Sequence, residues 1–251
     1  MLRIMLNGCN GKMGKVIAKS VLDRDDCEIV AGVDVNADEN DNFEVFKSIM
    51  EVKYDADVII DFSNPNALDL LLNFAIKNKM PIVFCTTGYS SEQINKIKSA
   101  SNIIPIFYSG NMSLGINLLI ELCKRSADVL GRDFDIEILE KHHNQKIDAP
   151  SGTAVMIADE ITSGLKTNSH YVYDRHSYRK PRNKNEIGIH SVRGGTIVGE
   201  HEVIFAGHDE VLKISHLAQS KEIFALGAIN AAVFICKKTA SLYDMSDLLN
   251  K

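Results

Sequence analysis

What the sequence lacks limits the kind of protein it can encode. No run of residues approaches the ~18 to 20 consecutive apolar residues of a membrane-spanning helix. The first residues, MLRIMLNGCNGKMG, lack the longer apolar stretch of a secretory signal peptide. We therefore expect a cytoplasmic protein with no membrane partner.

An excess of positive charge is also missing. The formal net charge is -5 and the pI is about 5.9, whereas a surface for nucleic acid or an anionic membrane needs a positive field. One basic segment, DRHSYRKPRNKN at 174–185, superficially resembles a nucleic-acid patch, with Tyr171, Tyr173 and Tyr178 in or beside it. Its proline and asparagines within an acidic chain favour a mobile surface loop. We expect no nucleic-acid partner.

Cysteine and metal-binding patterns are sparse. The five cysteines are odd in number, far apart and without CxxC spacing, which indicates reduced thiols that pack in the interior. His201 and Glu202 do not begin an HExxH motif, because Phe205 stands where the second histidine would be. We expect no metal. Internal repeats and low-complexity tracts are absent as well.

Short apolar runs and helical patterns fill the first part of the chain. The helical patterns lie at about 11–22, 68–78 and 90–100. Such alternation is typical of a parallel sheet covered by helices on both faces. We therefore predict a doubly wound, Rossmann-type α/β unit whose strands are the runs at 2–6, 28–33, 57–62, 81–88 and 102–108.

Beyond a helix expected at 114–130 the pattern changes. The later runs alternate polar with apolar residues, as strands exposed on one face do, and they lie at 134–140, 187–193, 196–207 and 210–218. We predict a second, α+β domain with an open mixed sheet. The apolar helix expected at 221–238 could close either domain, and the polar residues after it read as a tail.

A glycine turn follows the first apolar run. GCNGKMG places glycines at 8, 11 and 14, where the next helix begins. In a dinucleotide-binding turn, Gly8 permits the tight bend, Gly11 lets the backbone approach a pyrophosphate and Gly14 allows close helix packing. Asp34 ends the second run, where a carboxylate can bind the adenosine ribose and repel a 2′-phosphate. Glycines required only for a turn, and a solvated aspartate, are the simpler alternative.

The residues after Asp34 bear on the choice of cofactor. Val35 and Asn36 follow the acid and no arginine does, which favours NADH. Lys12 and Lys15 could still attract a 2′-phosphate. We predict that NADH is the preferred cofactor and that NADPH is usable.

Two further turns follow later strands. CTTG at 85–88 and SGNMS at 109–113 fall at the carboxyl ends of the fourth and fifth runs, the edge where open α/β sheets bind ligands. Their position makes them candidates for the nicotinamide side. Turns rich in small residues are also ordinary between a strand and a helix.

The segment EKHHNQKIDAPSGTA at 140–154 holds more ionisable groups than folding requires. Histidine titrates near neutral pH, and lysine can donate a proton when its pKa is lowered. Its histidines and lysines therefore suit a reaction in which an anionic substrate gains a proton. A charged surface loop is the alternative.

The second half of that segment leads into a helix. Ser151 or Asp148 could cap it. The backbone N–H groups of Gly152 and Thr153 would then point out of the helix start, where they can bind a carboxylate.

EILEKHHNQKIDAPSGTA resembles the signature of the 4-hydroxy-tetrahydrodipicolinate reductase (dihydrodipicolinate reductase) family of lysine and diaminopimelate biosynthesis. GCNGKMG, DFSNP, CTTG, SGNMSLGIN and SVRGGTIVGEHEV extend the resemblance in the same order over most of the chain. It implies a dinucleotide-binding domain at 1–112 and 220–251 and a substrate-binding domain at 113–219 that builds a homotetramer. It further implies hydride transfer from the nicotinamide to a small cyclic dicarboxylate, after loss of its hydroxyl as water.

The resemblance also implies roles for individual residues. His142 and Lys146 would be the proton-transfer pair, and sequence does not choose the donor between them. His143, Gly152 and Thr153 would hold the substrate's carboxylates. The cofactor would contact Gly8, Cys9, Asn10, Gly11, Lys12, Met13, Asp34, Cys85, Thr86, Thr87, Ser109, Gly110, Asn111 and Met112.

The chain departs from the family pattern at a few positions. Asn10 and Cys85 stand where members often have glycine, and Val35 stands where some have arginine, which weakens the case for tight NADPH binding. Two other functions stay open: a nicotinamide-dependent dehydrogenase for a different small carboxylate, and an NADH sensor without turnover. HHNQK favours an enzyme, because a sensor needs no proton donors beside its ligand.

Overall fold

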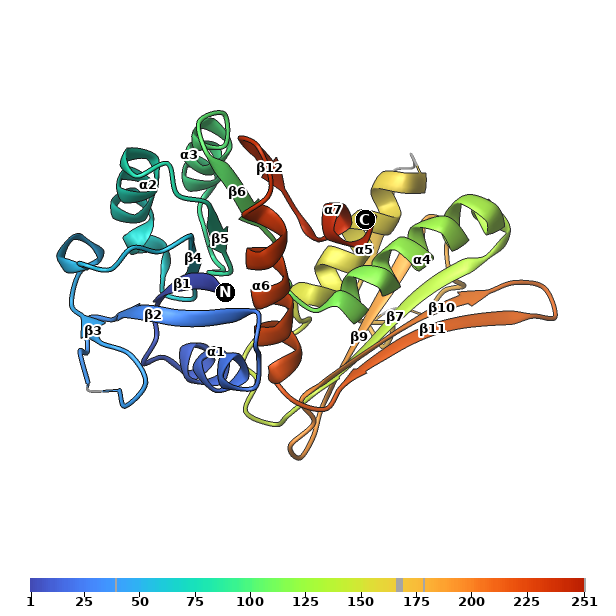
Figure 1. Cartoon of the computed structure of the whole chain (residues 1–251). Coiled ribbons are helices and arrows are strands. Elements are labelled where there is room, and N and C mark those ends of the chain that lie inside the picture. Colours follow the sequence, from blue (N-terminus) through green and yellow to red (C-terminus); the bar gives the residue numbers. More distant parts are fainter. Residues whose placement is uncertain (39, 166–168, 178, 251) are drawn as a thin grey trace. The chain divides into compact units, whose positions relative to one another are not determined.

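The computed structural model describes residues 1–38, 40–165, 169–177 and 179–250, with Arg132 described by its backbone alone. Tyr178 of the basic segment lies outside these residues. The chain divides into two compact units, Met1–Leu114 with Lys221–Lys251 and Gly115–Ser220 (Figure 1).

The first unit is built on a seven-stranded parallel sheet with the order β12-β6-β5-β4-β1-β2-β3. Its strands are β1 (Leu2–Asn7), β2 (Cys27–Val33), β3 (Val45–Phe46), β4 (Val58–Asp61), β5 (Ile82–Phe84), β6 (Pro105–Tyr108) and β12 (Ser241–Tyr243). The chain starts in the middle, runs to one edge through β2 and β3, and returns to β4 on the other side of β1. The predicted doubly wound fold is confirmed.

Helices cover both faces of this sheet. They are α1 (Lys12–Leu22), α2 (Leu68–Lys77), α3 (Ser91–Ala100), α6 (Glu222–Ile235) and α7 (Met245–Leu249), with short 3-10 turns at η1 (Ile49–Glu51) and η2 (Pro65–Ala67). Ile4 and Leu6 of β1 face a core shared with α1 and α6, whereas Met5 faces a core shared with α2 and α3. Because side chains alternate between the two faces of a strand, the apolar residues of β1 are divided between two cores.

The C-terminal part of the chain belongs to the first unit. Helix α6 is apolar around most of its circumference, and its buried residues join the core beside β1, β4 and β5. The residues expected to form a polar tail fold instead. Ser241–Tyr243 pairs in parallel with β6 at the sheet edge, and Asp244 begins α7 with a capping box completed by Asp247. Within the described residues, no helix has both the length and the apolar character needed to span a membrane.

The second unit is a mixed five-stranded sheet with two helices packed on one face. Its strand order is β11-β10-β7-β9-β8; β7, β8 and β9 run parallel, while β10 is antiparallel to β7 and β11. Its elements are α4 (Leu114–Leu130), η3 (Gly131–Asp133), β7 (Asp135–His142), α5 (Gly152–Leu165), β8 (His170–Val172), β9 (Glu186–Arg193), β10 (Gly199–Ala206) and β11 (Val211–Ala218). The predicted open mixed sheet is confirmed.

Strand β7 is longer than the sequence indicated. Lys141 and His142 were expected in the loop, but they are its last two residues. The reason is pairing on both sides: Lys141 lies opposite Glu200 of β10, and His142 lies opposite Arg193 of β9. Neighbouring strands therefore hold the histidine on a regular strand.

Candidate active site

The glycine turn of the first unit has the geometry that its spacing predicts. Gly8 has φ of 79°, and a Cβ there would lie 2.6 Å from the Phe62 carbonyl oxygen. A Cβ on Gly14 would lie 2.2 Å from the Gly8 carbonyl oxygen. Both positions therefore require glycine. Gly11 is the N-cap of α1, so no side chain covers the start of a helix whose N–H groups suit a phosphate.

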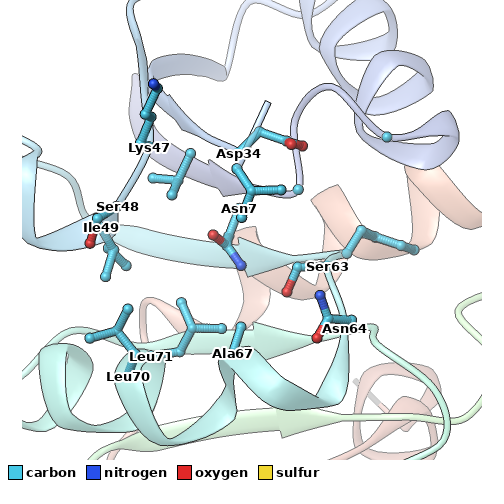
Figure 2. Close-up of a pocket in the computed structure, with 15 residues that line it drawn as sticks. Asn7, Asp34, Lys47, Ser48, Ile49, Ser63, Asn64, Ala67, Leu70 and Leu71 are labelled. Atoms are coloured by element: carbon cyan, nitrogen blue, oxygen red, sulfur yellow. The ribbon is translucent and has the colours of Figure 1, made fainter. Parts of the chain in front are cut away.

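A pocket of about 280 Å³ opens beside this turn (Figure 2). Gly8, Gly11 and Asp34 line it, together with Phe62 and Ser63 after β4. It thus lies at the carboxyl ends of β1, β2 and β4, where the strand order reverses and where doubly wound sheets bind nucleotides.

The carboxylate of Asp34 is held in place by backbone groups. Its two oxygens accept hydrogen bonds from the N–H of Asn10 at 3.1 Å and of Asn36 at 3.0 Å. The side chain of Asn10 donates to the Asn36 carbonyl at 2.6 Å. Asn10, where the family often has glycine, therefore ties the glycine turn to Asp34. Each carboxylate oxygen has a further lone pair for a ribose hydroxyl.

Lys47 is a pocket residue that sequence reasoning missed. It follows β3, whose last residue Phe46 pairs with Val33, the residue before Asp34. Lys47 and Asp34 both line the pocket (Figure 2). A strand of two residues leaves no periodic pattern, so no signal in the sequence placed Lys47 at this edge.

Asp61 is a second residue that was missed. Its side chain is fully buried at the end of β4, yet it carries a carboxylate. It accepts hydrogen bonds from Asn7 at 2.7 Å, from Ser63 Oγ at 2.6 Å and from Thr86 Oγ1 at 2.8 Å. It therefore joins the carboxyl ends of β1, β4 and β5. The sequence feature that could have identified Asp61 is an acid at the end of an apolar run, as in DVIID.

The CTT turn, at Cys85–Thr87, exposes one of its side chains. Cys85 and Thr86 are buried, and Thr87 is exposed. Burial, followed by the charge of Asp61, raises the pKa of the Cys85 thiol well above its usual value. A ligand at this turn would meet Thr87 and backbone groups.

Other predicted cofactor residues also turn inward. Cys9 and Met112 are 1% and 2% exposed and belong to the core, so a ligand can meet their backbone atoms only. Ser109 Oγ donates to the Asn111 carbonyl at 2.9 Å, and Asn111 Oδ1 accepts from the Ser113 N–H at 2.8 Å. These bonds fix the turn after β6. Gly110, Lys12 and Gly11 are exposed, and Met13 is half-buried.

A polar cluster in the second unit surrounds His142. Nδ1 of His142 lies 2.6 Å from Glu140 Oε2, and the guanidinium of Arg193 contacts both oxygens of Glu140 at 2.7 Å. Burial opposes ionisation of Glu140, but hydrogen bonds from Arg193, Ser191 and His142 outweigh it and lower the pKa of the carboxyl to about 2. Glu140 is therefore a buried anion at neutral pH.

The pKa of His142 is lowered. Burial is the largest cause, and the charges of Lys146 and Arg193 act in the same direction. The Glu140 carboxylate raises the pKa but does not offset them. His142 is therefore neutral at neutral pH, and its Nδ1 faces the Glu140 carboxylate.

Ser151 is the cap of α5. Its Oγ accepts the Ala154 N–H at 3.1 Å and lies 3.0 Å from Nε2 of His201. Burial, followed by the charge of His142, lowers the pKa of His201 to about 4. His201 is thus neutral at neutral pH, and its Nε2 shares a hydrogen bond with the Ser151 hydroxyl. Asp148, the other candidate cap, pairs with Lys146 instead.

The predicted residues of the second unit lie on one continuous segment that runs from the last residue of β7 through a loop to the first turn of α5. Lys146 Nζ lies 2.8 Å from Asp148 Oδ1, and its backbone N–H donates to the His143 carbonyl at 3.1 Å. His143 is half-buried. Gly152 is exposed and Thr153 is half-buried in the first turn of α5, as expected for residues that offer N–H groups.

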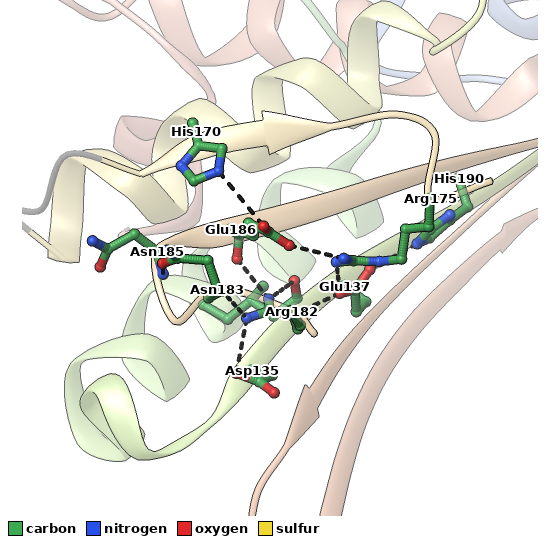
Figure 3. Close-up of polar contacts among 10 residues, drawn as sticks. Asp135, Glu137, His170, Arg175, Arg182, Asn183, Asn185, Glu186 and His190 are labelled. Atoms are coloured by element: carbon green, nitrogen blue, oxygen red, sulfur yellow. Dashed lines mark hydrogen bonds and ion pairs between the residues drawn. The ribbon is translucent and has the colours of Figure 1, made fainter. Parts of the chain in front are cut away.

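Two arginines of the basic segment pair with carboxylates of the second sheet (Figure 3). Arg175 lies 2.8 Å from Glu186 and 2.9 Å from Glu137, and Arg182 lies 2.9 Å from Glu137 and 2.8 Å from Asp135. These carboxylates on β7 and β9 compensate both guanidinium charges. The two arginines therefore make intramolecular ion pairs with the sheet and do not present free charges to a nucleic acid.

No group of His, Cys, Asp and Glu that could hold a metal ion occurs among the described residues. The glycine turn, the acid after β2 and the pocket at the strand ends fit a nicotinamide dinucleotide. With a second unit that carries a buried His-Glu-Arg cluster, the chain has the organisation of a nicotinamide-dependent oxidoreductase.

The chain belongs to the dihydrodipicolinate reductase family. The family profile "Dihydrodipicolinate reductase, N-terminus" matches residues 2–112, and "Dihydrodipicolinate reductase, C-terminus" matches residues 115–249. The resemblance inferred from its motifs is thereby confirmed.

Curated relatives and a solved structure agree with this family. The chain is 55% identical over 251 residues to 4-hydroxy-tetrahydrodipicolinate reductase of Caldanaerobacter subterraneus, covering 100% of this chain and 99% of that protein. It is 50% identical to the Clostridium tetani protein of the same name over 100% of this chain and 98% of that one. The fold matches dipicolinate-bound dihydrodipicolinate reductase from Paenisporosarcina with a TM-score of 0.82 and 24% identity over 97% of each chain. The chain is thus an enzyme, an oxidoreductase of lysine and diaminopimelate biosynthesis.

Proposed function

We propose that the chain reduces 4-hydroxy-tetrahydrodipicolinate to tetrahydrodipicolinate with NADH or NADPH, and that the loop after β7 supplies the proton. The observation that carries this proposal is the contact of His142 with Glu140, which Arg193 also binds, and the position of Lys146 in the loop between β7 and α5. These groups combine proton transfer with an anion-binding helix start. The Paenisporosarcina protein, which binds dipicolinate, supports a cyclic dicarboxylate as ligand.

The first unit would hold the cofactor. The backbone around Gly8 and Gly11 suits the pyrophosphate, and Asp34 suits the adenosine ribose. The turns after β5 and β6 would meet the nicotinamide side. When bound, the nicotinamide supplies a hydride.

NADH should be preferred. No arginine follows Asp34, and its carboxylate would repel the negatively charged 2′-phosphate of NADPH. NADPH should remain usable, because Lys12 and Lys47 place two ammonium groups near the same end of the sheet.

The substrate would bind in the second unit. Its carboxylates would meet the N–H groups of Gly152 and Thr153 and the imidazole of His143. Backbone donors at a helix start bind anions without the desolvation cost of a further buried charge.

Lys146 is the better proton donor of the pair. His142 is neutral and already commits its Nδ1 proton to Glu140, so its Nε2 carries a lone pair. The Lys146 ammonium, next to Asp148, carries protons that it can donate. His142 would then accept a hydrogen bond at Nε2 while Lys146 protonates the substrate.

The second sheet also supports the proposed homotetramer. Its open face, opposite α4 and α5, carries Val192, Val211 and Leu217, which are 43%, 58% and 56% exposed. These side chains lie among charged ones such as the Lys141–Glu200 ion pair, so the face offers both apolar and ionic contacts to another copy of the chain. Sedimentation velocity should give the mass of four chains, and a monomer at micromolar concentration would refute this assembly. A cytoplasmic location accords with five free cysteines, all of them described.

One assay tests the function against its alternatives. Freshly generated 4-hydroxy-tetrahydrodipicolinate should cause rapid loss of NADH absorbance at 340 nm, whereas unrelated keto acids should not. Turnover of a keto acid alone would indicate a different dehydrogenase. NADH binding without turnover of any of them would indicate a sensor.

A further inference from the structure

Glu140 is a buried carboxylate directly behind the imidazole of His142. Its side chain is 0% exposed, and its Oε2 lies 2.6 Å from the Nδ1 atom. The two residues are two positions apart on β7, so their side chains point to the same face of the strand. That face is the one covered by helices α4 and α5.

We propose that Glu140, clamped by Arg193, is a positioning residue that keeps the proton of His142 on Nδ1 and its lone pair on Nε2. The consequence for turnover rests on the proposed function, in which His142 faces the substrate. The control of the ring's tautomer by Glu140 does not rest on it.

Hydrogen bonds fix the orientation of the Glu140 carboxylate, and they come from Arg193, Ser191, His142 and the backbone of Ser151. Oε2 accepts from Arg193 Nη1 at 2.7 Å and faces the His142 ring. Oε1 accepts from Arg193 Nη2 at 2.7 Å and from the Ser151 N–H at 3.1 Å. Two parallel bonds from one guanidinium hold both oxygens in a plane, which lysine could not do.

Arg193 is itself fixed. It ends β9 directly opposite His142 in the parallel register, so both side chains leave neighbouring strand ends. Its Nη2 also donates to the Asp148 carbonyl at 2.7 Å, and its Nη1 donates to the Val192 carbonyl at 2.8 Å. The clamp therefore also ties the loop that carries Lys146 to the strand that carries His142.

No side chain at position 199 covers the other side of the imidazole. A Cβ at Gly199 would lie 3.2 Å from Nε2 of His142, so glycine keeps the space beside this atom open. The His201 ring of β10 stands edge-on at 5.2 Å between centroids. The charged or titratable groups that face the ring are thus Glu140 on its own strand, Arg193 on β9, His201 on β10 and Lys146 in the loop.

Two substitutions should shift the pKa of His142 in opposite directions. Glu140→Gln removes the charge that raises this pKa, so the pKa should fall below that of the unaltered protein. Arg193→Gln removes a charge that lowers it and strengthens the pull of Glu140, so the pKa should rise. If the substitutions only loosened the packing around His142, its pKa would move towards that of an exposed histidine in both variants.

The measurement is ¹⁵N–¹H correlation NMR of the full-length protein with ¹⁵N-labelled histidine, recorded over a pH range. Assignment of the His142 signals comes from a spectrum of His142→Asn. The unaltered protein should show the Nδ1–H tautomer. Its spectrum tests the predicted tautomer even if a variant does not fold. An Nε2–H tautomer, or pKa shifts of the same sign in both folded variants, would overturn the proposal.

Kinetics provide a second readout. Glu140→Gln should lower kcat about 10- to 100-fold, the usual effect of losing a partner that orients a reacting group, while KM changes less than about threefold. Glu160→Gln is the matched control, since it removes an exposed carboxylate paired with Lys124 at 3.2 Å in the same unit. Unchanged kcat in folded Glu140→Gln would refute the positioning role. If His142→Ala also turns over normally, the proposed role of His142 at the substrate fails, while the reductase activity and the NMR result still stand.

Discussion

Asp34 and Lys47 stand at the carboxyl ends of neighbouring parallel strands, one step beyond the paired residues Val33 and Phe46. They bring opposite charges to the same pocket. The carboxylate suits a free ribose diol, and the ammonium suits a 2′-phosphate. The relative use of the two nicotinamide cofactors should therefore depend on both.

Lys47→Gln should lower kcat/KM for NADPH about three- to tenfold, because it removes one charge-assisted contact to phosphate, and should leave the value for NADH within about twofold. Lys53→Gln, an exposed lysine outside the pocket, is the control. Initial rates with both cofactors measure the ratio. Competitive inhibition by 2′,5′-ADP and 5′-AMP reports the same selectivity without turnover. An equal loss with both cofactors would show that Lys47 does not read the 2′-position.

Lys146→Ala should lower kcat about 10²- to 10⁴-fold, the usual effect of losing a proton donor. His142→Ala should also be strongly impaired. Lys146→Ala should remain folded by circular dichroism, since the Lys146 side chain pairs with exposed Asp148. Near-normal kcat in folded Lys146→Ala would rule out the assignment of the donor.

Asp61→Asn should destabilise the first unit by about 1 to 3 kcal/mol, because an amide nitrogen replaces an oxygen that accepts hydrogen bonds from buried hydroxyls. The affected partners are Thr86 and Tyr89. KM for NADH should rise, since Thr86 belongs to the turn after β5. Chemical denaturation and initial rates measure the two effects. Asp69→Asn, at a carboxylate that is 68% exposed, should show neither effect.

The stability of the second unit should fall with acid in two steps. The pKa of His201 is lowered to about 4 in the folded protein, so as the pH falls the unfolded chain protonates this histidine before the folded protein does. The folded state therefore loses stability relative to the unfolded chain as the pH falls from about 6.5 to 4. Glu140, with a pKa of about 2, contributes stability that is lost only below about pH 4.5.

His201→Asn keeps a partner for Ser151 but cannot titrate. Between pH 6.5 and 4 the melting temperature of this variant should therefore fall less than that of the unaltered protein. The difference corresponds to roughly 2 to 4 kcal/mol in the free energy of unfolding. A residual slope should remain, because the pKa values of His142 and His216 are also lowered. Melting curves at closely spaced pH values would show parallel slopes if His201 contributes nothing.

Local patterns in the sequence suffice for the architecture. The apolar runs that became β1 and β4 predict a sheet covered on both faces, because both of their sides are buried. Ser151 and the glycines at 8 and 14 are also predictable, since a cap and a close backbone approach each require a particular residue type.

Partners distant in the sequence are not predictable in this way. Arg193 lies 53 residues beyond Glu140, and only the pairing of β7 with β9 brings them together. Lys47 reaches the pocket through a strand too short to leave a pattern. Nothing in the sequence distinguishes Glu140 from an acid on the surface, whereas its carboxylate is completely buried in the structure.

The return of α6 to the first unit has a consequence for synthesis on the ribosome. Ile4 and Leu6 share their core with Ala228 and Ile229 of α6. The intervening residues, Gly115–Ser220, form a unit of their own. The part of the protein that is made first therefore cannot complete its interior until nearly the whole chain has emerged, whereas the second unit has all its residues earlier. Nascent-chain proteolysis should find the second unit protected before the first, the reverse of the usual order of folding during translation.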